Sequence, residues 1–91
     1  MKDSDIELFK HQIKTKIPYV LFEEIEEVLL TIRRIAETIF EKKIIVTVDV
    51  SGNEIEAYAR YDVFHLKDNN DTNFIDTVNI PVVWSQNPKE N

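Results

Sequence analysis

The sequence predicts an α+β fold in which a short N-terminal helix and one long helix pack on one face of a three-stranded antiparallel sheet, in the order ααβββ. Two observations support this prediction. Through the first half of the chain, apolar residues recur at spacings of three and four, which is typical of helices with one buried face. From Lys43 onward the apolar period changes to two, which is typical of strands. A chain of 91 residues can bury one modest core, so we expect a single domain over residues 1–84 and a polar, flexible tail over residues 85–91.

The first helix is expected to have Ser4 as its N-cap and to end near Lys14. Ser4 and Glu7 have the spacing of a capping box, in which each side chain accepts a backbone N–H at the helix start. The apolar residues of this segment share one face: Ile6, Phe9 and Ile13.

The long helix is expected from about Pro18 to Lys42, because a proline fits the first turn of a helix and disfavours helix in the residue before it. An apolar stripe runs along it through Leu21, Ile25, Val28, Ile32, Ile35 and Ile39, widened by Phe22, Leu29, Ala36 and Phe40. This face is broader than a coiled-coil seam, so we expect it to cover the sheet. A second interpretation is that part of the stripe, with Tyr19 and Leu30 beside it, forms a dimer interface.

Three strands are expected over residues 43–50, 55–66 and 74–84, with Gly52-Asn53 as a two-residue hairpin turn between the first two. This turn would place Val48 opposite Ala57 and Asp49 opposite Glu56. The small Ala57 and Ala59 side chains leave room for the long helix. Pro81 cannot donate a backbone hydrogen bond, so the third strand is expected at an edge of the sheet.

Composition narrows the classes of function. The chain has no Cys, its first residues are charged, and it has no apolar run of about 18 residues, so we expect a cytoplasmic protein without a membrane span. The net charge of −6 argues against direct binding of nucleic acid or anionic lipid and favours a partner with a basic surface.

No catalytic or cofactor motif stands out, and we expect neither an enzyme nor a cofactor or metal site. The only histidines are His11 and His65, and the single Gly cannot form a phosphate-binding loop. The polar loop at 67–73 resembles a calcium loop in composition, but Asn73 and Asn79 stand where an EF-hand needs Gly and Glu.

The predicted fold gathers seven acidic residues at one end of the molecule, because the strand after the long helix must run back along it. They are Glu23, Glu24, Glu26, Glu27, Asp49, Glu54 and Glu56. We therefore expect a protein-binding module whose acidic end docks on a basic surface. Small acidic inhibitors, immunity proteins and phage anti-defence proteins work in this way, and the abundance of Ile, Lys, Asn and Glu is typical of AT-rich bacterial or phage genomes.

The alternative is a homodimeric structural or assembly subunit without ligand chemistry. Its dimer would form through the edge strands at Lys43–Val50 and Phe74–Trp84, or through the outer flank of the long helix.

Overall fold

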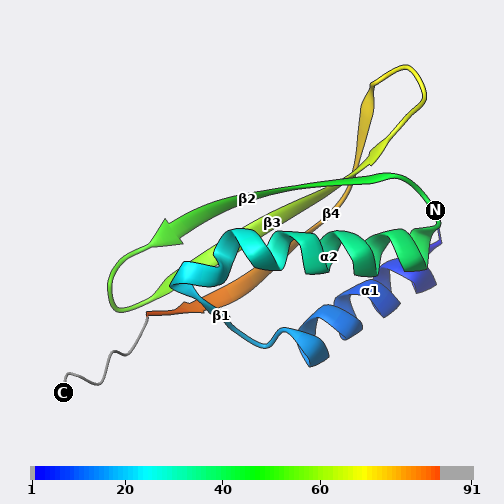
Figure 1. Ribbon diagram of the computed structural model, residues 1–91. Coiled ribbons are helices and arrows are strands. Elements are labelled where there is room, and N and C mark those ends of the chain that lie inside the picture. Colours follow the sequence, from blue (N-terminus) through cyan, green and yellow to red (C-terminus); the bar gives the residue numbers. More distant parts are fainter. Residues whose placement is uncertain (1, 85–91) are drawn as a thin grey trace.

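The computed structural model describes residues 2–84 as two helices packed against a four-stranded sheet (Figure 1). The predicted α+β class is confirmed. The elements in chain order are α1 (Asp3–Lys16), β1 (Val20–Leu21), the 3₁₀ turn η1 (Phe22–Glu24), α2 (Ile25–Phe40), β2 (Ile44–Gly52), β3 (Ala57–Leu66) and β4 (Thr72–Val83). The expected tail at 85–91 lies outside the described residues.

The sheet is mixed and has the strand order β1-β4-β3-β2, so the predicted three-stranded antiparallel sheet is wrong in this detail. The extra strand is β1, which runs parallel to β4 and pairs Val20 with Val82 and Leu21 with Val83. β4 is therefore an inner strand at its C-terminal end. Before Val82 it pairs with β3 alone among the described strands.

The long helix begins at Ile25, so the prediction that it begins near Pro18 is wrong. The apolar stripe includes Leu21 but leaves Val20 outside it. In the structure Val20 is almost fully buried, and its backbone pairs with β4. Tertiary packing of Val20 thus outweighs the local helical pattern, and η1 then turns the chain into α2.

The first helix begins two residues earlier than predicted and has no capping box. Its N-cap is Lys2, and no side chain caps its first turn. Asp3 and Asp5 lie in that turn, and Lys14 and Lys16 lie in the last one. The charges at both ends therefore interact favourably with the helix dipole.

The hairpin between β2 and β3 has a four-residue loop, and each β2 residue pairs with a β3 residue four positions later than predicted. Gly52 has a φ of 107°, and Asn53 Oδ1 accepts hydrogen bonds from the backbone N–H groups of Ile55 and Glu56 at 2.8 and 2.9 Å. Val48 therefore lies opposite Tyr61 in place of Ala57. Because a shift by an even number of residues, here four, keeps the alternation of faces, the apolar side still points toward the helices.

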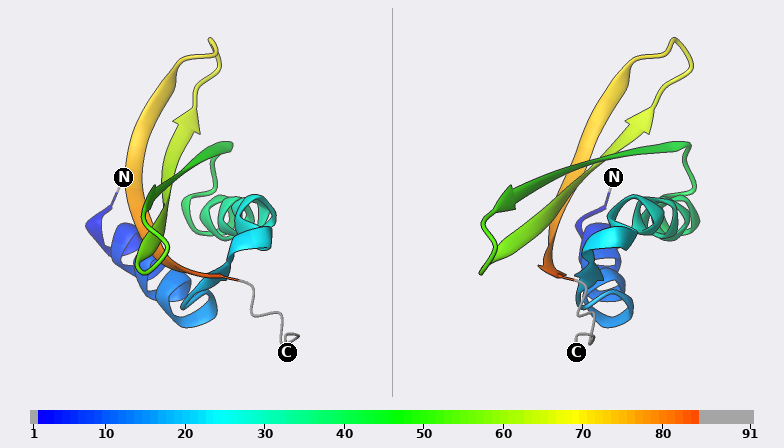
Figure 2. Two further views of the ribbon diagram at one scale, coloured as in Figure 1. Left: turned by 90° about the vertical axis from the view of Figure 1, so that its left-hand side faces the viewer. Right: turned by 60° about the vertical axis from the view of Figure 1, so that its left-hand side comes forward.

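One hydrophobic core joins the helices to the sheet. α2 lies over β2 and β3, and α1 lies beside α2, toward the free side of β4 (Figures 1 and 2). The rings of Phe9 and Phe40 connect the two helices with their centroids 5.6 Å apart. At the centre, the fully buried Tyr61 donates its hydroxyl proton to the carbonyl oxygen of Ile25 over 2.6 Å.

Candidate functional site

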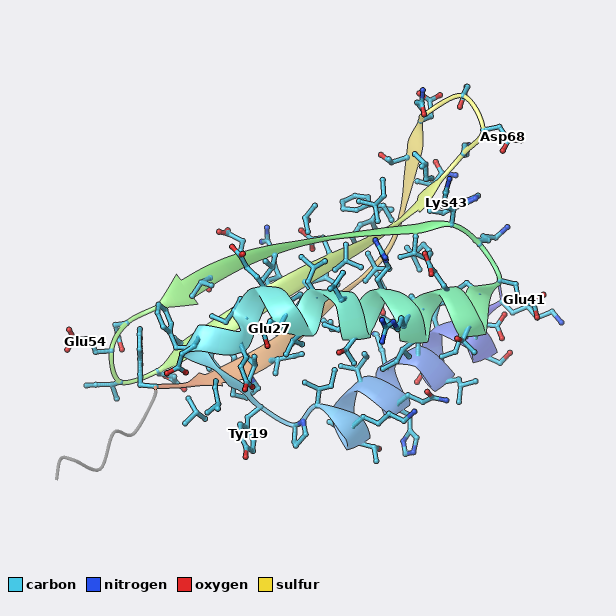
Figure 3. The ribbon with its side chains drawn as sticks, viewed as in Figure 1. Tyr19, Glu27, Glu41, Lys43, Glu54 and Asp68 are labelled. Atoms are coloured by element: carbon cyan, nitrogen blue, oxygen red, sulfur yellow. The ribbon has the colours of Figure 1, made fainter. Side chains whose placement is uncertain are left out.

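The seven acidic residues predicted as a binding site are all exposed, but the structure divides them between two sides of the molecule. Glu54 lies at the tip of the β2–β3 hairpin, and Glu27 lies on the outer surface of α2 (Figure 3). Glu24 is an exposed residue of η1. Glu23 and Glu26 lie beside the hairpin on the side that faces the helices. Asp49 and Glu56 lie on the opposite side of the sheet.

Glu23 and Glu26 share a shallow pocket of 290 Å³ at the junction between η1, α2 and β2. Phe22, Ile25 and Val50 complete its lining. The pocket shows that the end of β2 returns beside the beginning of α2, as the predicted path of the chain requires. Two carboxylates and three apolar side chains are therefore combined on one small surface.

Asp49 and Glu56 belong to a different environment. The expected pairing of Asp49 with Glu56 is wrong, because the four-residue shift in register places Asp49 opposite Arg60. Opposite charges across a strand pair are favourable, so no electrostatic conflict remains there. Glu56 Oε2 accepts a hydrogen bond from the Tyr58 hydroxyl over 3.4 Å, on the side of the sheet that points away from α2.

An exposed aromatic pair extends the surface that Glu23 and Glu26 form beside the hairpin. The rings of Phe22 and Trp84 stack with their centroids 4.5 Å apart and their planes 28° apart. Both side chains keep more than a third of their surface exposed. The name acidic–aromatic patch is used below for Phe22, Glu23, Glu26, Val50 and Trp84. The sequence did not reveal the aromatic pair, because Phe22 reaches Trp84 only when β1 pairs with β4.

A second cavity lies between α1 and β4, on the free side of that strand. It has a volume of 620 Å³, which is within the usual range for ligand pockets. Its lining comes from two segments of the chain. β4 contributes the residues from Thr77 to Pro81, and α1 with the chain after it contributes Glu7, Lys10, His11, Ile13, Lys14, Ile17 and Pro18. None of these residues belongs to the site that the sequence predicts. They are called the α1–β4 groove below.

Within residues 2–84, no three or more His, Cys, Asp or Glu side chains are grouped so that they could hold a metal ion. Burial raises the pKa of Tyr61 to about 12, but this hydroxyl belongs to the core. Neither helix of the described chain has the length and apolar character that crossing a membrane demands.

Comparisons with protein-family models, with curated proteins and with solved structures give no significant match.

Proposed function

We propose that this protein is a binding module that docks through the acidic–aromatic patch onto a basic, partly apolar surface of another protein. An inhibitor, immunity or anti-defence protein would work in this way. The observation that supports the proposal is the exposed Phe22–Trp84 stack beside the pocket that Glu23 and Glu26 share. Exposed aromatic groups rimmed by charges are typical of protein interfaces.

The two kinds of side chain would have separate tasks. Aromatic residues that become buried in an interface supply much of its affinity, and the stack offers two adjacent rings. The carboxylates of Glu23 and Glu26 would select a basic partner and speed the encounter, because complementary charges steer association. The net charge of −6 acts in the same direction over the whole molecule.

Charge reversal on the two sides of the hairpin tests this proposal. We expect the double variant Glu23→Lys with Glu26→Lys to lose the partner that the wild-type chain captures from a lysate of the source cells and that mass spectrometry identifies. The matched control is Asp49→Lys with Glu56→Lys, which changes the net charge equally on the opposite side of the sheet. It should retain the partner.

A third variant, Phe22→Ala, separates apolar contact from charge. It should weaken binding of the purified partner by at least about tenfold, since truncating a central interface aromatic commonly costs more than about 1.4 kcal/mol. Unchanged capture by the Glu23/Glu26 variant would show that the patch is not the docking surface. Loss confined to the Asp49/Glu56 variant would assign the interface to the other side of the sheet.

We propose a homodimer as the second candidate, because β2 is a terminal strand of the sheet. Its nine residues, Ile44–Gly52, contain no proline and pair only with β3 among the described strands. An open edge of this length can pair with a second copy. Sedimentation at micromolar concentration tests the idea, and a strict monomer would exclude it.

A further inference from the structure

The α1–β4 groove follows the edge of a strand and not the face of the sheet. Successive side chains of a strand point to opposite faces, so a cavity on one face is lined by every second residue. Here five consecutive residues line the cavity, from Thr77 to Pro81. The opposite wall is a stripe of α1 at helical spacing, Glu7, Lys10, His11 and Lys14, followed by the C-cap residue Ile17. The groove therefore has a strand edge on one side and a helix on the other.

This strand edge has backbone groups available for hydrogen bonding. β1 pairs with β4 only at Val82 and Val83. The backbone N–H of Thr77 donates to Asp76 Oδ1 over 2.9 Å, which shows that this N–H points away from β3. Residues two apart in a regular strand direct their backbone groups to the same side. The N–H and carbonyl of Asn79 consequently point into the groove.

Both ends of the open edge are closed. At one end, Asp76 occupies the N–H of Thr77, and Lys10 Nζ lies 3.8 Å from Asp76 Oδ2. At the other end, β1 pairs with β4 at Val82 and so covers the edge there. An added strand would thus lie in line with β1 along a short segment centred on Asn79.

The helix wall carries Lys10 and Lys14 in a protein that is acidic as a whole. Lys10 is paired with Asp76, whereas no ion pair within residues 2–84 involves Lys14 or His11. Glu7 supplies the one acidic side chain of the helix wall. The core residues Ile13 and Ile17 also contribute to the lining of the groove.

We propose that the α1–β4 groove binds an extended acidic segment of a partner protein, which adds as a strand to the edge of β4. Backbone hydrogen bonds to Asn79 would hold the segment, and its carboxylates would pair with Lys14 and accept a hydrogen bond from His11. Strand addition at an open edge beside a helix uses main-chain bonds for affinity and side-chain pockets for specificity. This site and its acidic ligand are separate from the acidic–aromatic patch and its basic partner.

Selection from a display library of random linear peptides on the full chain tests this proposal. We expect the selected peptides to be rich in Asp and Glu, alternating with β-branched residues. Addition of a selected peptide should shift the amide resonances of Asn79 and Lys14 in an ¹⁵N–¹H spectrum. No enrichment, enrichment of basic peptides, or shifts elsewhere on the protein would overturn the proposal.

Two variants of the same helix provide the charge control. Lys14→Glu should weaken the best selected peptide by at least about tenfold, because a hydrogen-bonded charge pair is lost and a repulsion is added. Lys16→Glu makes the same change of charge two residues later, on an exposed side chain outside the groove. It should change the affinity by less than about twofold, and an equal loss in both variants would show that only net charge matters.

A change in the peptide tests the backbone bonds without altering the fold of the protein. N-methylation of alternate peptide amides removes the donors on one side of an extended strand. One of the two methylated series should lose binding, and the other should retain it. If both series bind as well as the parent peptide, no strand is added. If the chain dimerises through β4 instead, the Asn79 resonance will depend on protein concentration, and the proposal fails.

Discussion

Tyr61 connects the middle of β3 to the first residue of α2. Its side chain is fully buried, and its hydroxyl donates to the carbonyl oxygen of Ile25 over 2.6 Å. The neutral hydroxyl suits this position, because burial disfavours the charged phenolate and raises the pKa from 10.0 to about 12. A residue with this environment should affect stability at alkaline pH.

We predict that wild-type stability falls between pH 10 and pH 12. In this interval the unfolded chain releases the Tyr61 proton while the folded chain retains it, so rising pH favours unfolding. The contribution is complete below pH 10, and a shift of about two pKa units corresponds to roughly 2–3 kcal/mol. Denaturant unfolding at a series of pH values measures it.

Tyr61→Phe is the control for this titration, since it keeps the ring and removes the ionisable group. It should cost about 1 kcal/mol at neutral pH through the lost hydrogen bond. Above pH 10 it should lose less stability than the wild type does, whereas Tyr58→Phe, at an exposed position, should follow the wild type. Parallel pH curves for wild type and Tyr61→Phe would contradict the assignment.

Gly52 fixes the conformation of the β2–β3 hairpin. Its φ of 107° is rarely accessible to other residues, and a Cβ atom would meet the carbonyl oxygen of Glu56 well inside van der Waals contact. We predict that Gly52→Ala lowers the free energy of unfolding by about 2 kcal/mol or more. Ser51→Ala, on the exposed neighbouring residue, should change it by less than about 0.5 kcal/mol. Equal unfolding curves for the two variants would show that the hairpin tolerates another turn.

At the level of elements, sequence periodicity predicted what is locally encoded. Both helices, the three long strands and the position of the hairpin follow from apolar spacing and from the single Gly. The exact loop length does not follow, because Gly52-Asn53 fits a two-residue turn as well as the four-residue loop that Asn53 closes with its side chain. β1 could not be predicted either, since two residues carry no periodicity and their partner lies 62 residues away.

The start of α2 gives a direct test of local pattern against tertiary pairing. In the structure Val20 is almost fully buried and Leu21 is partly exposed. We therefore predict that Val20→Ala costs about 2 kcal/mol and Leu21→Ala clearly less. A helix from Pro18 would reverse this order, because Leu21 lies on the apolar stripe and Val20 does not. Tyr19→Ala, at an exposed position before β1, is the control and should cost less than about 0.5 kcal/mol.

At the level of the whole molecule, charge could be predicted from the sequence more readily than surface shape. The path of the chain back along the long helix already indicated that Glu26 and the hairpin lie at one end. Because side chains alternate along a strand, Val50 faces the pocket of Glu23 and Glu26, and Asp49 points to the opposite side of the sheet. The prediction of a single acidic end did not take this alternation into account. The α1–β4 groove could not be predicted from the sequence, because Lys14 and Asn79 line the same groove only through the packing of α1 beside β4.

The overall charge leads to a last prediction, which separates a field effect from a contact effect. Each Glu→Lys exchange adds two charge units, so Glu23→Lys with Glu26→Lys moves the net charge from −6 to −2. Binding of a selected acidic peptide in the α1–β4 groove should then tighten at low salt, because the repulsion from the rest of the protein is weaker.

The matched variant, Asp49→Lys with Glu56→Lys, changes the net charge by the same amount from the other side of the sheet, so it should tighten binding to a similar degree. At physiological ionic strength charges are screened over about 8 Å, and both gains should shrink below about twofold. Titration calorimetry at two salt concentrations measures these changes. A gain for Glu23/Glu26 alone that persists at high salt would mean that the peptide touches the acidic–aromatic patch, and the two surfaces would then form one continuous site.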